Sequence, residues 1–170
     1  GINFLDTAEC YGAGHLSERL IGNALAGRRH EWIIATKFGH NPNNDLKDEN
    51  YSPAQVLLQL EESLRALQTD YIDVYQLHSA ADEWFDNDAL WTMLGKQVDA
   101  GKVRHLGNSV PLANAKHQVP RSRDFGISVI QVPYNALLTK AEEVVLPEAQ
   151  RQDLGVIART PLASGFLSGK

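Results

Sequence analysis

The chain opens with GINFLDTAECYG, residues 1–12, in which strand-forming apolar residues lead directly into an acid. Residues 2–5 predict a short buried strand that ends at Asp6, and Tyr11 follows in a turn that contains glycine. A carboxylate at the end of a strand, with a phenol on the loop behind it, can serve acid–base chemistry. Taken alone, the stretch is explained better by an aspartate that caps a turn and a tyrosine that packs on the surface, so the rest of the chain has to decide.

The composition is that of a globular protein with a modest acidic charge. The chain has 170 residues and a formal net charge of −5, which predicts one domain and gives no sign of a nucleic-acid-binding surface. No apolar run approaches the roughly 20 residues of a membrane span, and no signal-peptide pattern opens the chain. The single cysteine, Cys10, cannot form an internal disulfide, which favours a reducing compartment, and we expect a cytoplasmic protein. The six histidines show no metal-ligand spacing, so no metal site is expected.

Strand and helix signals alternate along the chain. After residues 2–5, apolar runs predict strands at 32–36, 71–77, 103–107, 127–132 and 154–158. Helical spacing of apolar residues predicts helices near 16–25, 52–67, 87–100 and 141–153, and 112–123 is assigned to helix or turns. Ser17 is the expected N-cap of the first helix, and Ser52, Pro53 and Gln55 predict a capping box at the start of the second.

Six strand–helix repeats without hairpin signals predict a parallel sheet, because parallel neighbours need crossover connections. Two α/β architectures fit: an open doubly wound sheet or a (β/α)8 TIM-type barrel. No GxGxxG follows a strand, which favours the barrel, with about six of its eight βα units in the chain. In both architectures ligands bind at the carboxyl ends of the strands.

Four candidate catalytic residues lie at or just after such strand ends: Asp6, Tyr11, Lys37 and His78. Lys37 alone is explained as a solvated charge, and His78 alone as a hydrogen-bonded imidazole. Together they predict proton transfer: the Lys37 ammonium lowers the pKa of Tyr11 from its usual value near 10, while Asp6 keeps Lys37 charged and in place. A neutral His78 would donate a hydrogen bond to a carbonyl oxygen. The expected reaction is hydride addition to a carbonyl, with Tyr11 as the general acid.

Five segments carry a resemblance to a known family. They are residues 1–12, IATKFG at 34–39, the segment 62–78 that ends in QLH, residues 101–104 with Gly107, and PLASG at 161–165. With these segments the chain resembles the aldo-keto reductases, the barrel-fold NADPH-dependent carbonyl reductases. The resemblance implies that Asp6, Tyr11, Lys37 and His78 form the catalytic tetrad, with Tyr11 as the acid, and that NADPH is the cofactor.

The resemblance also implies cofactor contacts. Ser109 and Gln131 fall where the nicotinamide carboxamide is held, and the loop along the pyrophosphate corresponds to Thr160, Leu162, Ser164 and Gly165. Two positions depart from the common pattern. Val110 stands where the family usually has asparagine, so one amide contact is missing. Arg159 stands where many members stack a tyrosine on the nicotinamide, and its guanidinium plane can stack on a ring as well.

Length is the larger departure from the family. Residues 1–170 are expected to form a single partial barrel domain that runs from the second to the seventh strand, with two unpaired strand edges. The segment that grips the adenosine 2′-phosphate is absent from this range, so NADPH as opposed to NADH rests on the resemblance alone. The substrate is expected to be a small-molecule aldehyde or ketone, and the oligomeric state stays open.

The sequence leaves two alternative functions open and gives weaker signals in a polar loop and two aromatic residues. The chain could instead be a nicotinamide-binding regulatory module similar to potassium-channel β subunits, or an inactive truncated paralogue. The polar loop 39–51 is expected to be mobile. Trp84 and Phe85, just past His78, are expected to wall a substrate pocket.

Overall fold

The computed structural model describes residues 1–40 and 49–169, so the central part of the polar loop 39–51 lies outside the described residues. All six predicted strands are present, each within two residues of its expected bounds. The strands are β1 Phe4–Asp6, β2 Ile33–Phe38, β3 Ile72–His78, β4 Val103–Ser109, β5 Ile127–Pro133 and β6 Gly155–Arg159. The helices are α1 Leu16–Ala24, α2 Pro53–Leu67, α3 Asp82–Phe85, α4 Asp88–Asp99, α5 Ala115–Gln118 and α6 Val145–Gln152. Short 3₁₀ turns are η1 Arg29–Glu31, η2 Val119–Phe125, η3 Lys140–Glu142 and η4 Ala163–Gly165.

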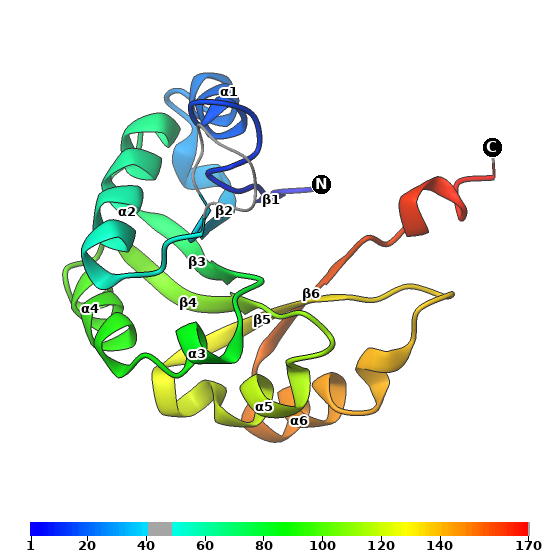
Figure 1. Ribbon diagram of the computed structural model, residues 1–170. Helices are drawn as coiled ribbons and strands as arrows, with labels where there is room; N and C mark the ends of the chain where they lie inside the picture. The colour runs from blue at the N-terminus through cyan, green and yellow to red at the C-terminus, as the bar shows by residue number, and fades with distance from the viewer. Residues whose placement is uncertain (41–48, 170) are drawn as a thin grey trace.

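The strands form one parallel sheet in the order β1-β2-β3-β4-β5-β6. Each strand therefore lies beside its predecessor along the chain, and the strand order never reverses. A doubly wound sheet requires such a reversal, so that alternative is excluded. The sheet curls into a half-barrel, with the helices on its outer side and its inner face open (Figure 1).

The hydrophobic core lies between the outer face of the sheet and the helices. Alternate residues of each strand face outward, and Ile34, Tyr75 and Leu77 are completely buried there. Leu60 of α2 and Leu94 of α4 are equally buried in the same cluster. The inner face is thereby left to the other set of alternating residues, which includes the polar candidates.

The two predicted helix starts differ from expectation in detail. Helix α1 begins at Leu16, not after Ser17, because His15 adopts a left-handed conformation (φ 59°) and occupies the N-cap position. The hydroxyl of Ser17 instead accepts a hydrogen bond from Thr7 at 2.8 Å. Ser52 is the N-cap of α2, as predicted, but its hydroxyl donates to Asn50 Oδ1 at 2.8 Å, so the capping box is not formed.

No helix in residues 1–40 and 49–169 is long and apolar enough to cross a membrane.

Candidate active site

The four predicted catalytic residues come together at one end of the sheet. Asp6 and His78 are the last residues of β1 and β3, and Lys37 lies next to the end of β2. Tyr11 lies on the loop between β1 and α1. Because the strands are parallel and in register, their carboxyl ends meet on one side, where Lys37 pairs with Gln76 across the sheet.

Lys37 is the buried centre of this group, with 1% of its surface exposed. Its Nζ donates to Asp6 Oδ2 at 2.8 Å and to the carbonyl of Thr7 at 2.7 Å. The same nitrogen lies 5.1 Å from the centre of the Tyr11 ring. Burial lowers the pKa of Lys37, and the contact with Asp6 opposes that effect. Asp6 therefore holds the ammonium in place, as predicted.

The pKa of Tyr11 departs from the sequence prediction. Burial raises it, the charge of Asp6 raises it further, and Arg159 opposes both. The expectation that Lys37 lowers this pKa is wrong for the structure, because Lys37 directs hydrogen bonds to Asp6 and Thr7 and meets the face of the Tyr11 ring. The phenol thus keeps its proton at neutral pH, and 44% of the residue is exposed to solvent.

His78 meets the condition that the sequence analysis set for it, because it is uncharged at neutral pH. Burial lowers its pKa to about 3, and the positive charges of Lys37 and Arg159 act in the same direction. Its ring lies edge-on to Tyr11, with 6.0 Å between the ring centres. Its Nδ1 lies 3.8 Å from the sulfur of Cys10. Burial raises the pKa of that thiol to about 11, so Cys10 stays protonated.

Two residues that the sequence analysis missed fix the backbone of His78. Its carbonyl accepts hydrogen bonds from the Tyr51 hydroxyl at 2.8 Å and from His40 Nε2 at 3.1 Å. The next residue, Ser79, has a left-handed backbone (φ 55°), which is costly for a residue other than glycine. Since His40 and Tyr51 come from the far ends of the loop after β2, no local pattern could have indicated them.

Only one of the two predicted pocket aromatics remains close to this group. Trp84 packs on Tyr51, with 5.6 Å between ring centres. Phe85 is fully buried and packs on Trp91 and Phe125, so its assignment to a pocket wall is wrong.

Asp6 also has amide partners from two other strands. Its Oδ1 accepts from Gln131 Nε2 at 2.8 Å and from Gln76 Nε2 at 3.4 Å. Ser109 in turn donates to Gln131 Oε1 at 3.3 Å. Ser109 and Gln131, the two predicted carboxamide contacts, thus lie together on the inner face. Gln76 was missed, although it stands two residues before His78 and so shares its face of the strand.

The remaining predicted cofactor residues lie in two places: Arg159 at the end of β6, and the pyrophosphate contacts on the segment after it. Val110, where the usual amide contact is missing, lies in the core. Arg159 ends β6, and its charge influences the pKa of Tyr11, Lys37 and His78, so it belongs to the same region. Val110 is completely buried in the core and only its backbone N–H reaches toward β5, where it bonds Gln131 O. The predicted pyrophosphate contacts are all exposed, on a segment that leaves the sheet after β6 (Figure 1): Thr160, Leu162, Ser164 and Gly165.

The model of the aldo/keto reductase family matches residues 1–170. The chain belongs to the aldo/keto reductase family. This aldo/keto reductase chain is 36% identical over 184 residues to the uncharacterized oxidoreductase YrpG of Bacillus subtilis (strain 168), an alignment that covers 100% of the chain and 56% of YrpG. A second relative is the Schizosaccharomyces pombe (strain 972 / ATCC 24843) protein whose name is aldo-keto reductase yakc (NADP(+)). The two sequences are 31% identical over 176 residues, which cover 99% of this chain and 51% of that relative.

A solved structure agrees with both the sequence match and the fold. The holo form of aldo-keto reductase AKR11C1 from Bacillus halodurans superposes with a TM-score of 0.85 at 35% identity, covering 100% of this chain and 56% of that one. The chain therefore spans about half the length of the curated relatives it matches.

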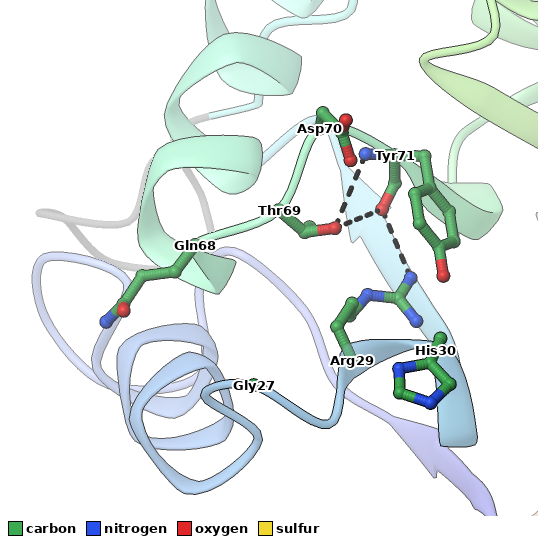
Figure 2. Close-up of a pocket in the computed structure, with 7 residues that line it drawn as sticks. All are labelled: Gly27, Arg29, His30, Gln68, Thr69, Asp70 and Tyr71. Atoms are coloured by element: carbon green, nitrogen blue, oxygen red, sulfur yellow. Dashed lines mark hydrogen bonds between the residues drawn. The ribbon is translucent and has the colours of Figure 1, made fainter.

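A surface pocket of this aldo/keto reductase chain lies at the opposite end of the sheet (Figure 2). Its lining comes from the turn after α1 and from residues 68–71, which precede β3. The Arg29 guanidinium in this lining donates to the Tyr71 carbonyl at 3.1 Å and to Asp73 at 2.6 Å. In this pocket Arg29 connects the segment before β2 to the start of β3. The lining of the pocket does not include Lys37 or the residues around it.

Proposed function

We propose that this chain carries the catalytic groups of an NADPH-dependent oxidoreductase that reduces the carbonyl of an aldehyde or ketone to an alcohol. The observation that carries the proposal is the Lys37 ammonium, 2.8 Å from Asp6 and 5.1 Å from the centre of the Tyr11 ring. A buried ammonium beside a phenol is costly to maintain for structure alone. Family membership supports oxidoreductase chemistry. Residues 1–170 are proposed to be one partial barrel domain, comprising the second to seventh of eight βα units.

The inner face offers groups that suit a nicotinamide cofactor. The Ser109 hydroxyl and the Gln131 amide lie 3.3 Å apart and together present donors and acceptors that match a carboxamide. The Nε of Arg159 is buried without a hydrogen-bond partner among the described residues, which leaves its guanidinium free to stack on a ring. When bound, the reduced nicotinamide supplies the hydride.

The cofactor preference and the phosphate contacts follow from the family and from sequence position. The name of yakc carries NADP(+), which supports NADPH as the cofactor. The proposed contacts along the pyrophosphate are Thr160, Leu162, Ser164 and Gly165.

Tyr11 is proposed to donate the proton that the carbonyl oxygen needs as hydride arrives at the carbon. Its raised pKa keeps the proton on the phenol until negative charge develops on the substrate oxygen. The Lys37 ammonium lies 5.1 Å from the centre of the Tyr11 ring and packs against its face. Asp6 keeps Lys37 in this position throughout.

His78 is proposed to orient the carbonyl. A neutral imidazole has one N–H, and the protonated Cys10 thiol lies near its Nδ1. Donation of the S–H to Nδ1 puts the ring proton on Nε2, the nitrogen left for the substrate. The substrate class is a small molecule with an aldehyde or ketone group, because these groups act on one carbonyl oxygen.

The test is a nucleotide titration followed by turnover of a simple aldehyde, for wild type and Tyr11→Phe. Loss of the acid is expected to lower kcat by 10²–10⁴-fold, with the NADPH dissociation constant within about twofold of wild type. Tyr71→Phe is the matched control, since Tyr71 lies at the other end of β3 between Arg29 and Arg104. Wild-type turnover in Tyr11→Phe would sink the proposal, and tight nucleotide binding without turnover in wild type would favour a regulatory module.

A further inference from the structure

Gln131 makes a contact that a carboxamide ligand does not require. Its Nε2 donates to Asp6 Oδ1 at 2.8 Å, across the inner face of the sheet. The two residues lie on β5 and β1, which are separated in the sheet by β2, β3 and β4. Gln131 is 1% exposed, so its amide has few other partners to choose from. A long-range bond of this kind ties opposite sides of the half-barrel to one carboxylate.

The bond belongs to a continuous chain of polar contacts. Ser109 donates to Gln131, Gln131 donates to Asp6, and Asp6 accepts from Lys37. An amide has two N–H groups and two oxygen lone pairs, so Gln131 retains one of each after these contacts. It can therefore hold Asp6 and face a second amide at the same time.

We propose that Gln131 is a positioning residue for the Asp6–Lys37 ion pair. Gln76, at 3.4 Å from the same carboxylate oxygen, is the second and weaker support. A second element of the proposal rests on the proposed function: Gln131 would face the cofactor carboxamide and also hold the Asp6–Lys37 ion pair next to Tyr11. Cofactor binding and the state of the acid–base group are then linked through one side chain.

The physical reason lies in what the ion pair loses without the amide. Charge-assisted hydrogen bonds are the strong ones, and a carboxylate that loses its donor is free to turn toward water. The side chain of Asp6 is 31% exposed, so water is within its reach, whereas Lys37 is buried and depends on Asp6 to offset desolvation. The charged or titratable groups that face this pair are Tyr11 on the β1–α1 loop, Cys10 beside it, His78 on β3 and Arg159 on β6.

The experiment measures the titration of Lys37 in the cofactor-free protein, by NMR of ¹³Cε-labelled lysine, with Lys37→Met to assign the signal. Gln131→Leu removes the donor and is expected to lower the Lys37 midpoint by about one pH unit, because the ion pair weakens. Gln131→Glu keeps the shape but adds a negative charge, and is expected to raise the midpoint. Gln131→Leu carries the test of the positioning role, and Gln131→Glu shows that the Lys37 signal responds to a charge placed at this position.

Two controls separate this role from others. Gln118→Leu removes a buried amide that bonds Ala80 O and Asn108 away from the inner face, and should leave the Lys37 midpoint unchanged. Ser109→Ala should weaken NADPH binding but shift Lys37 by less than a quarter of the Gln131→Leu change. A Lys37 midpoint that stays at the wild-type value in Gln131→Leu would overturn the inference. Failure of the proposed function would appear separately, as absence of NADPH binding to wild type, and the Lys37 titration decides the positioning role in either case.

Discussion

Burial keeps two ionisable side chains near Tyr11 uncharged at neutral pH, and it does so with opposite consequences for stability. Burial raises the pKa of Glu9 to about 9 and lowers that of His78 to about 3. For His78 the unfolded chain binds the proton better, so its contribution is present above pH 6.5 and is lost as the pH falls toward 3. For Glu9 the folded protein binds the proton better, so its contribution is present below pH 4.5 and is lost as the pH rises toward 9.

Glu9→Gln tests this residue-scale account. The amide keeps an acceptor for the His40 N–H, which lies 2.9 Å from Glu9 Oε1, and it has no proton to lose. We expect the free energy of unfolding at pH 8 to rise by roughly 2–4 kcal/mol, and to be unchanged at pH 4. Urea unfolding at the two pH values measures the difference. Glu61→Gln, at a half-exposed ion pair with Lys102, serves as the control. An equal gain at both pH values would mean that packing, not ionisation, is responsible.

At the scale of elements, the packing of α1 against α2 depends on Gly22, which has no side chain. Gly22 of α1 lies against the end of α2, where an added Cβ would come within 2.7 Å of the Ala66 carbonyl oxygen. These are backbone atoms, so the helices would have to move apart. Gly95 of α4 has open space around its Cα, so the two glycines differ in their surroundings although both are helical.

Alanine at these two positions is expected to act in opposite directions. Gly22→Ala should destabilise the protein by about 1–3 kcal/mol through overpacking. Gly95→Ala should stabilise it by about 0.5–1 kcal/mol, because alanine restricts the unfolded chain and favours the helix. Thermal or urea unfolding of the two variants gives both values. A stabilising Gly22→Ala would show that α1 and α2 do not need this close contact.

The elements themselves were predictable because their signals are local. Apolar runs defined every strand, and Pro53 with Ser52 marked the start of α2. The predictions that failed concern details that no local pattern sets. Ser17 does not cap α1 because the left-handed His15 takes the N-cap position, and Lys37 does not lower the pKa of Tyr11 because it bonds Asp6 and Thr7.

At the scale of the whole molecule, the half-barrel brings distant parts of the chain to one inner face. Strand order and the parallel register bring Asp6, Lys37 and His78 together, and sequence analysis could anticipate this from their place at strand ends. It could not anticipate the bond from Gln131 to Asp6, which joins residues 125 positions apart. That contact requires the curvature of the sheet, and no local pattern encodes curvature.

Nucleotide binding to this inner face should stabilise the whole fold. A ligand present at 100 times its dissociation constant adds about 2.7 kcal/mol to the free energy of unfolding, which corresponds to a rise in Tm of roughly 5–10 °C for a chain of this size. We expect NADPH to give this rise in wild type and in Tyr11→Phe, whose phenol is proposed to act on the substrate. The rise should shrink in Ser109→Ala combined with Arg159→Ala, which removes the proposed carboxamide and stacking contacts. Differential scanning calorimetry with NADPH, and with NADH for comparison, measures each Tm. An undiminished rise in the double variant at the same NADPH concentration would mean that Ser109 and Arg159 do not contribute to nucleotide binding, since the stabilisation follows the dissociation constant of the folded state.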